Sequence, residues 1–254
     1  MRIARFGLWG WLALVAATGQ CLAAPALRVV TEELPPYNMM SSDGRVTGLS
    51  TEIVQAVMRE AGASARIEVL PWARAYDMAL NVPNVLIYSI ARTAEREPLF
   101  QWVGALAPTR WYLYSLADRP VRLDNLADAR GHQIATVHED VGEQYLIGKG
   151  FKPGSELQAT SKYEYNYRKL KVDHVELWIS NELNAVYLVR KNGDDPDKVL
   201  VKSLALPELS RDEGLSLAFS RGTPPETVDR FRAALARLRA DGTIEAILNK
   251  WLRD

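Results

Sequence analysis

Two arginines, Arg92 and Arg96, follow an apolar run at residues 85–90 that contains Ser89. The run predicts a buried strand, and ligands of α/β proteins commonly bind at the carboxyl ends of such strands. A guanidinium fork can hold both oxygens of a carboxylate, and one helical turn between the arginines would place them on one face. The spacing predicts an anion site held by Arg92, by Arg96 or by both, and a surface arginine that caps a helix is the alternative. The Ser89 hydroxyl could accept from an ammonium group or donate to a carboxylate.

Aromatic residues are also expected at the edge of the predicted sheet where the strand with Ser89 ends. Tyr37 stands in a Pro-Pro loop after the first predicted strand, and Trp72 and Arg74 begin the helix that follows the second strand. Trp111 and Tyr112 are neighbours on a later strand, where successive side chains point to opposite faces, so one of them should face the site. For Tyr37 and Trp72, packing in the core is as good an interpretation as contact with a ligand.

Signals for other chemistry are weak. The histidines His132, His138 and His174 are scattered and lack the close spacing of a metal site. The sequence contains no Gly-x-Ser-x-Gly turn, no phosphate-binding loop and no Gly-x-Gly-x-x-Gly fingerprint. We therefore expect neither a metal nor a cofactor.

The order of the predicted elements positions these residues. Hydrophobic periodicity predicts three strands that alternate with two helices: strands at 27–31, 65–70 and 85–90, and helices at 50–61 and 71–80. Ser50 is the expected N-cap of the first helix. This β-α-β-α-β order predicts a parallel sheet covered by helices, so the fold class is α/β. Residues 118–213 contain a second βα series, and the chain ends in a strand and two helices.

Length and composition limit the function. The 254 residues suffice for one large domain or two small lobes. With 48% hydrophobic and 24% charged residues, collagen, coiled coil and wholesale disorder are excluded. Lys and Arg total 31, as do Asp and Glu, and a protein that binds nucleic acid would normally show a basic excess. We expect no nucleic-acid partner.

The first residues are typical of a secretory signal peptide. Basic residues precede an apolar stretch at 6–18, and small residues follow at 21–26. Cleavage is expected after Ala23, with a cut after Ala26 as the alternative. Removal of residues 1–23 leaves 231 residues with a net charge of −2. The later apolar runs are short and interrupted by charges, so we expect a periplasmic protein without stable membrane insertion.

The predicted leader also contains Cys21, the single cysteine of the chain. The mature protein should therefore have neither a disulfide nor thiol chemistry. A lipid anchor on Cys21 is the less favoured alternative, because Gln20 stands where that signal has a small residue.

Several short motifs stand along the chain in a fixed order. They are Pro36-Tyr37 after the first strand, Gly48-Leu49-Ser50-Thr51-Glu52-Ile53 at a helix start, Thr93-Ala94-Glu95-Arg96, an aromatic strand at 111–114, and Leu238-Arg239-Ala240-Asp241-Gly242-Thr243-Ile244 followed by Trp251. Together they resemble the type II periplasmic solute-binding proteins, family 3, which serve polar amino-acid ABC transporters. The resemblance spans essentially the whole chain after the leader.

The resemblance implies two Rossmann-like α/β lobes joined by two crossing hinge strands. Lobe 1 would comprise residues 24–117 and 214–254, and lobe 2 would comprise residues 118–213. The crossing strands would lie near 111–117 and 214–219. A ligand would sit in the cleft, the lobes would close on it, and the protein would be a monomer.

The resemblance also implies roles for single residues. Arg96 matches the arginine that holds a ligand carboxylate, and Tyr37 the aromatic residue that packs on the ligand. Asp140 and Val141 fall in a segment that donates to the carboxylate at a helix N-terminus, but Asp140 replaces a small hydroxyl residue. The ordinary interpretation of Asp140 is an N-cap, and a carboxylate there disfavours a second anion. Asn181 stands where the family has an aspartate against the ligand ammonium, so the usual charge is missing.

We therefore expect a binding protein that captures a small polar ligand, an amino acid or related compound, and delivers it to an ABC permease. It would not be an enzyme. A modified amino acid, a small peptide-like acid or a cationic ligand that uses Glu139 or Asp140 is also open. One alternative is a cyclohexadienyl dehydratase-like enzyme with Glu139, Asp140 or Glu182 as the proton-transfer group. Another is a sensor that docks to a membrane receptor.

Overall fold

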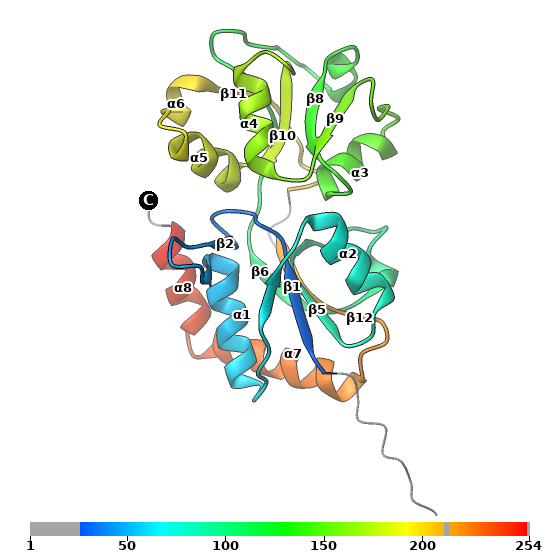
Figure 1. Ribbon diagram of the computed structural model, residues 1–254, viewed down its shortest axis with the longest axis vertical. Helices are drawn as coiled ribbons and strands as arrows, with labels where there is room; N and C mark the ends of the chain where they lie inside the picture. Colours follow the sequence, from blue (N-terminus) through cyan, green and yellow to red (C-terminus); the bar gives the residue numbers. More distant parts are fainter. Residues whose placement is uncertain (1–25, 211–213, 253–254) are drawn as a thin grey trace, which may run out of the picture.

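The computed structural model describes residues 26–210 and 214–252. The predicted signal peptide, its cleavage site and Cys21 lie outside these residues. The described chain forms two α/β lobes, each built on a five-stranded sheet (Figure 1). The expected fold class is confirmed.

The first lobe has a sheet with the strand order β4-β1-β5-β12-β6. Its strands are β1 (Arg28–Thr31), β4 (Ile67–Val69), β5 (Val85–Ala91), β6 (Phe100–Ala107) and β12 (Leu215–Ser220). β1, β4 and β5 are parallel, and β12 is antiparallel to β5 and β6. Its helices are α1 (Leu49–Glu60), α2 (Trp72–Asn81), α7 (Pro225–Ala240) and α8 (Thr243–Leu252). α1, α7 and α8 pack together, whereas α2 packs on β1, β5 and β12.

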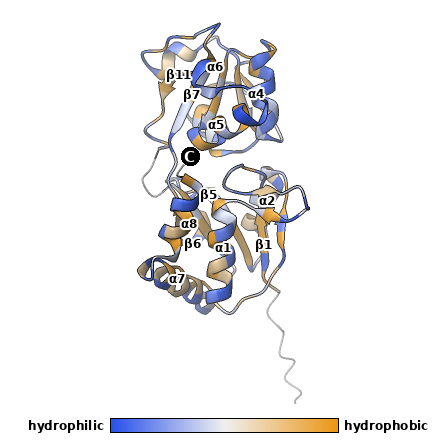
Figure 2. Cartoon of the chain, turned by 90° about the vertical axis from the view of Figure 1, so that its left-hand side faces the viewer, coloured by the Kyte–Doolittle hydropathy of each residue, from blue (hydrophilic) through white to orange (hydrophobic). Residues whose placement is uncertain are grey.

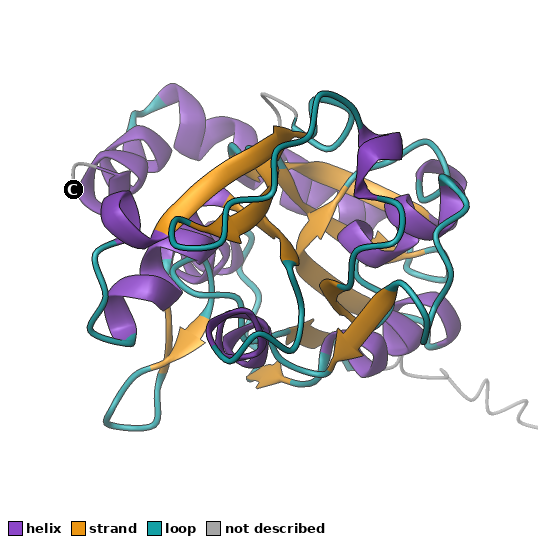
Figure 3. Cartoon of the chain, turned by 90° about the horizontal axis from the view of Figure 1, so that it is seen from above, coloured by secondary structure: helices purple, strands orange, loops and turns teal. Residues whose placement is uncertain are grey.

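The second lobe has a sheet with the strand order β11-β7-β10-β8-β9. Its strands are β7 (Trp111–Leu116), β8 (Ile134–Val137), β9 (Leu157–Thr160), β10 (Leu177–Asn181) and β11 (Leu200–Ala205). Its helices are α3 (Val141–Gly148), α4 (Tyr163–Lys171), α5 (Glu182–Lys191) and α6 (Pro196–Val199). β7 is antiparallel to β10 and β11, and the other pairs are parallel. Seen from above, helices flank the strands on both sides (Figure 3).

The first crossing of the chain between the two sheets lies earlier in the sequence than expected, whereas the second falls between Ala205 and Leu215, a range that contains the expected boundary at 213–214. β7 pairs with β10 and β11, so Trp111–Leu116 lies wholly in the second sheet. The edge of the first sheet is taken by β6, which the sequence analysis did not predict. The crossing therefore falls between Ala107 and Trp111, not at residue 117. We propose that the lobe boundaries are near residues 110 and 210.

Elements with weak periodicity were also missed by the sequence analysis. These are the hairpin of β2 (Met39–Met40) and β3 (Val46–Thr47), β9 and α4. The N-cap of α1 is Gly48 rather than Ser50, whose hydroxyl has no partner among the described residues. The N–H groups of Leu49, Ser50 and Thr51 instead donate to carbonyls of the Pro36-Tyr37 loop. The first turn of α1 is thus satisfied by backbone, and it holds Tyr37 in place.

Gly48 makes this contact possible, because its φ of 120° lies in the left-handed region and a Cβ would overlap the Tyr37 carbonyl oxygen. Gly48→Ala should lower the free energy of unfolding by about 2–3 kcal/mol, and the thermal midpoint by roughly 5–10 °C. Gly62→Ala is the matched control: its φ is 61°, and a Cβ there meets nothing within 4 Å. Gly62→Ala should lower the free energy of unfolding by only about 1 kcal/mol. Thermal unfolding would contradict the prediction if both variants lost the same stability.

Hydrophobic residues gather on the strands of both lobes (Figure 2), and buried apolar residues form the core of each lobe. One buried cluster runs across the boundary and joins Tyr37 of the first lobe to Tyr163 of the second. A second cluster, which includes Trp111 and Val141, covers the other face of the second sheet. Because buried apolar surface continues from one lobe into the other, the lobes are closed on each other.

Candidate functional site

The centre of the interlobe boundary is Arg96, which is only 1% exposed. Its guanidinium lies 5.3 Å from the ring centre of Trp72 and 4.9 Å from that of Tyr76. Within the first lobe, Nη1 donates to the Ala91 carbonyl oxygen at 3.3 Å. Across the boundary, Nε and Nη2 donate to Gln144 Oε1 at 3.3 and 3.0 Å. Arg96 therefore links the two lobes, and two aromatic rings fix its orientation.

The other two predicted cations face away from this centre. Arg92 donates to both carboxylate oxygens of Glu97, at 2.7 and 2.6 Å, and its side chain is 40% exposed. Residues 94–96 form a turn rather than a helix, so Arg92 and Arg96 do not lie on one helical face. Arg74 is exposed on α2, where its charge acts on Glu68. The structure therefore does not bring Arg92 and Arg74 to the interlobe boundary beside Arg96, and a ligand contact by either residue stays a prediction.

Two buried carboxyls from opposite lobes flank Arg96: Glu32, directly after β1, is 4% exposed, and Asp140, before α3, is 6% exposed. Burial raises the pKa of the Glu32 carboxyl well above its ordinary value, and repulsion from Asp140 adds to the shift. Arg96 and Tyr163 act in the opposite direction. Burial also raises the pKa of Asp140, against the influence of Tyr163 and Arg96. We call Glu32, Arg96, Asp140 and Tyr163 the charged cluster.

Asp140 occupies the N-cap position of α3, as expected, yet its side chain forms no capping hydrogen bond. The N–H groups of Val141 and Gly142 lower its pKa, as do Tyr163 and Arg96, whereas burial raises it. The carboxyl of Asp140 therefore lies between the charged cluster and the first turn of α3.

Further hydrogen bonds cross the boundary beside the cluster. Trp72 Nε1 donates to the Glu139 carbonyl oxygen at 2.8 Å, and Asn184 Nδ2 donates to the Pro35 carbonyl oxygen at 2.7 Å. Both bonds join groups that would separate if the lobes opened. Trp72 thus contributes to closure as well as to the stack on Arg96.

Trp72→Phe keeps the ring but removes the cross-lobe bond, so it should weaken closure by about 0.5–1.5 kcal/mol. Trp102→Phe is the matched control, because its indole donates to Glu97 within the first lobe at 3.1 Å. Small-angle scattering of the two ligand-free variants should show a larger open fraction for Trp72→Phe alone. Equal open fractions would contradict a role for Trp72 in closure.

Tyr37 and Asn181 lie at the hinge end of the boundary, and both are fully buried. The Tyr37 hydroxyl donates to the Pro108 carbonyl oxygen at 3.2 Å. Burial raises the pKa of Tyr37, and the charge of Glu182 adds to it. Asn181 Oδ1 accepts from the Asn184 N–H at 3.0 Å, while Nδ2 has no partner among the described residues. Asn181 therefore offers a donor, not the acceptor that an ammonium group needs.

The remaining predicted residues pack in the cores of the two lobes next to the interlobe boundary. Ser89 is buried, donates to Asn38 Oδ1 and has a φ of 60°, a strained conformation that the surrounding sheet maintains. Trp111 and Val141 belong to the core on the far face of the second sheet, and Val141 also lines a cavity between the lobes. Tyr112, the neighbour of Trp111, is half-buried beneath Lys202 Nζ, 4.7 Å from the ring centre.

Sequence reasoning missed three members of the boundary. Glu32 directly follows β1, so the edge criterion that selected Ser89 would have found it. Tyr163 begins α4, which was not predicted. Gln144 lies one turn after Asp140 on α3 and carries no signal of its own.

Two cavities lie near this region. One of about 450 Å³ opens between the lobes and is lined by Thr93 of the first lobe and by Val141, Gln144 and Tyr145 of the second. Its volume is within the usual range for ligand pockets. Because Gln144 lines this cavity and also accepts from Arg96, the cavity adjoins the charged cluster.

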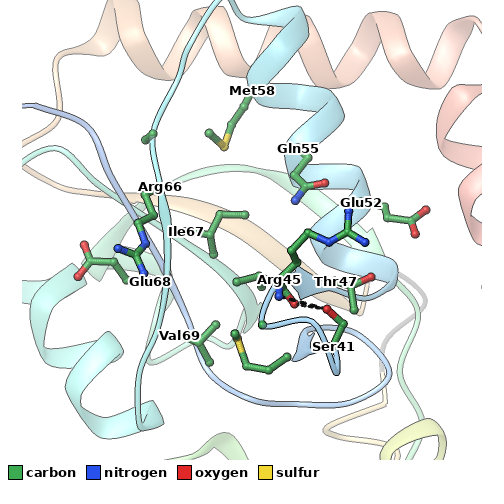
Figure 4. Close-up of a pocket in the computed structure, with 14 residues that line it drawn as sticks. Ser41, Arg45, Thr47, Glu52, Gln55, Met58, Arg66, Ile67, Glu68 and Val69 are labelled. Carbon is green, nitrogen blue, oxygen red and sulfur yellow. Dashed lines mark hydrogen bonds between the residues drawn. The ribbon is translucent and has the colours of Figure 1, made fainter.

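The other cavity, about 1120 Å³, lies on the first lobe between the β2–β3 hairpin, α1 and β4 (Figure 4). Four charged side chains line it: Arg45, Glu52 and Glu68 are paired with Asp43, Lys250 and Arg28, and the fourth is Arg66. No member of the charged cluster lines it. We therefore place the candidate site between the lobes and not in this larger cavity.

Neither metal ligation nor membrane insertion is indicated for residues 26–210 and 214–252. No group of three or more His, Cys, Asp or Glu side chains there could hold a metal ion. His138 lies 3.4 Å from the Glu143 carboxylate and His132 lies 4.0 Å from that of Glu176. No helix in this part of the chain is both long and apolar enough to cross a membrane.

Two α/β lobes that the chain crosses twice, closed over a buried arginine, define the periplasmic-binding-protein type II fold. The chain belongs to the bacterial extracellular solute-binding proteins, family 3, whose sequence model matches residues 27–254. The resemblance seen in the sequence is thereby confirmed.

Known relatives are distant. The L-cystine-binding protein TcyJ of Escherichia coli K12 is 19% identical over 218 residues, which are 85% of this chain and 78% of that protein. A histidine kinase sensor domain with similarity to periplasmic binding proteins has a TM-score of 0.77 at 22% identity, covering 89% of this chain and 96% of that one. The arginine-, lysine-, histidine-binding protein ArtJ of Geobacillus stearothermophilus has a TM-score of 0.72 at 19% identity, covering 90% and 96%. At such identities the structures show the fold alone.

Proposed function

We propose that this protein is an exported receptor that captures a small polar solute, an amino acid or related compound, between its lobes and delivers it to an ABC permease. The observation that carries the proposal is the contact of buried Arg96 with Gln144 of the other lobe. Because this contact shows that the two lobes meet at Arg96, a ligand that binds groups of both lobes there favours the closed form. A permease can distinguish the closed form of the receptor from the open form.

The ligand-facing residues that we propose are the charged cluster together with Tyr37, Trp72, Gln144 and Asn181. Ser89, Trp111 and Val141 would act as support. Export to the periplasm rests on the predicted leader at residues 1–23 and on membership of an extracellular family. An amino-acid ligand is supported by relatives whose names include L-cystine-binding and arginine-binding.

Thermal unfolding against the common amino acids, small dicarboxylates and polyamines tests this function. A ligand at 100 times its dissociation constant adds about 2.7 kcal/mol, which should raise the midpoint by roughly 5–10 °C. A stoichiometric titration by calorimetry then confirms binding. The absence of any shift across the panel would contradict an amino-acid receptor.

A sensory role is the second candidate, because a histidine kinase sensor domain matches 89% of this chain. The two roles predict different losses in a strain that lacks this protein. Loss of radiolabelled ligand uptake indicates delivery to a permease. Unchanged uptake with a lost transcriptional response to the ligand indicates docking to a membrane receptor.

An enzymatic role has no equivalent support, since the named relatives of this chain bind or sense solutes. Glu182, one of the candidate proton-transfer groups, is paired with Lys202. We expect prephenate and arogenate to be recovered unchanged after incubation, as followed by chromatography. Their consumption would favour the dehydratase alternative.

A further inference from the structure

Acidic groups outnumber basic groups within the interlobe boundary. Two buried carboxyls, Glu32 and Asp140, face one guanidinium, Arg96, and the other groups that act on them are neutral: the Tyr163 phenol on both carboxyls, and the N–H groups of Val141 and Gly142 on Asp140. Glu143, another buried acid of the second lobe, points elsewhere: its carboxylate accepts from the Thr136 hydroxyl and the Glu139 N–H, beside His138. If both carboxyls ionise, at least one negative charge lacks a positive partner, and burial raises the pKa of both groups because it disfavours that state.

The donors of Arg96 are largely occupied within the protein. Nε and Nη2 converge on Gln144 Oε1, Nη2 also reaches the Glu139 carbonyl oxygen at 3.5 Å, and Nη1 donates to Ala91. A ligand carboxylate would have to displace Gln144 from the guanidinium fork. It would then stand among Glu32 and Asp140, where like charges repel it.

The third observation is an unpartnered donor. Asn181 is fully buried, and its Nδ2 has no partner among the described residues. It caps α5, and Asn184 on the same helix bonds to Pro35, three residues from Glu32. A buried amide N–H of this kind needs an acceptor, and a neutral carbonyl or hydroxyl oxygen of a ligand would satisfy it.

We propose that the ligand is a cation without a free carboxylate, whose positively charged nitrogen is held jointly by Glu32 and Asp140 and whose neutral oxygen accepts from Asn181. Arg96 is then a positioning residue that holds Gln144 and the two carboxyls in place. This inference rests on the proposed function, because it names the class of ligand for the same cleft. Primary amides of amino acids have this chemistry, and so do related amines that carry a hydroxyl group.

The rise in pKa of both carboxyls fits this arrangement. A cation between Glu32 and Asp140 would supply the missing positive charge and favour their ionised forms. Binding should therefore release protons, which calorimetry detects as a difference in apparent enthalpy between phosphate and Tris buffers. A zwitterion placed with its carboxylate at Arg96 would not have this effect.

The experiment compares arginine, lysine and leucine, each as the free amino acid, the primary amide and the decarboxylated amine. Thermal shift and calorimetry are measured on the mature protein. We expect one amide to bind at least tenfold more tightly than its free amino acid, and its amine to fall between the two. Tighter binding of a free amino acid leaves the proposed function standing and overturns this inference. No response to any of the nine compounds, nor to the wider panel above, overturns both.

Variants locate the cation. Glu32→Gln and Asp140→Asn each remove one negative charge at nearly constant shape, and each should weaken the best amide or amine at least tenfold. Glu33→Gln is the matched control, since Glu33 is half-buried beside Lys162, outside the charged cluster. The ligand-free variants should unfold at the wild-type temperature or above, because a neutral amide replaces a buried carboxyl whose ionised form is costly. Wild-type affinity in both Glu32→Gln and Asp140→Asn would contradict the proposal.

Discussion

Replacing Arg96 with alanine should open the lobes of the ligand-free protein. The substitution leaves Glu32 and Asp140 without a positive charge between them and removes both contacts to Gln144. Breaking a buried ion pair costs about 3–5 kcal/mol. Because the carboxyls come from opposite lobes, opening the boundary returns them to water. The lost interaction energy therefore destabilises the closed form relative to the open form. The population of the closed form should drop by a factor of about 100 or more.

The same argument limits the effect on folding. Neither lobe needs the charged cluster for its own sheet, so the thermal midpoint should fall by a few degrees only. Small-angle scattering would report the opening as a larger radius of gyration. Arg92→Ala is the control, because the exposed pair with Glu97 is worth at most about 1 kcal/mol. Closed lobes in Arg96→Ala, or equal opening in both variants, would contradict the assignment of Arg96.

Arg96→Ala also separates the two possible ligand classes. A free amino acid held by its carboxylate should lose affinity by about 100-fold or more, because the charge-assisted fork is removed. A cation held by Glu32 and Asp140 should lose no more than about tenfold, since the removed charge repelled it. Calorimetry with the tightest free amino acid and the tightest amide measures both changes.

Closure of the ligand-free protein should weaken as the pH rises. The pKa of Glu32 is raised in the closed form and returns towards its ordinary value of 4.5 when the lobes open. Between these two pKa values the closed form binds more protons than the open form. The free energy of closure therefore becomes less favourable with rising pH through this window, by at most about 1.4 kcal/mol per pH unit for one proton. Below pH 4.5 the contribution of Glu32 to the free energy of closure is fully present.

Scattering between pH 5 and 9 should show this opening, and Glu32→Gln should flatten the profile while Glu33→Gln retains it. The affinity for a cationic probe should change in the opposite direction, because the cation needs ionised carboxyls. A pH-independent closed fraction in the wild-type protein would contradict the titration of Glu32. A cation affinity that falls with rising pH would contradict the role of the two carboxyls.

Much of the fold could be predicted from the sequence alone. The strands β1 and β5 and the helices α1, α2, α7 and α8 have strong hydrophobic periodicity, and order and spacing sufficed for the family. Local patterns carry this information because helices and strands bury one face with a fixed period. The same patterns did not predict β6 and assigned β7 to the first lobe, since pairing across a sheet decides which strand belongs to which lobe.

For the site, the sequence determined that Ser89 and Arg96 stand near the carboxyl end of a strand. The same rule applied to β1 would have added Glu32. Only the tertiary structure decided that Arg96 turns inward while Arg92 turns to solvent, because an irregular turn separates them. Only closure brings Glu32 and Asp140, 108 positions apart in the numbering, into one buried cluster. Their shared charge depends on distance and desolvation, which belong to the packed lobes and not to any segment of the chain.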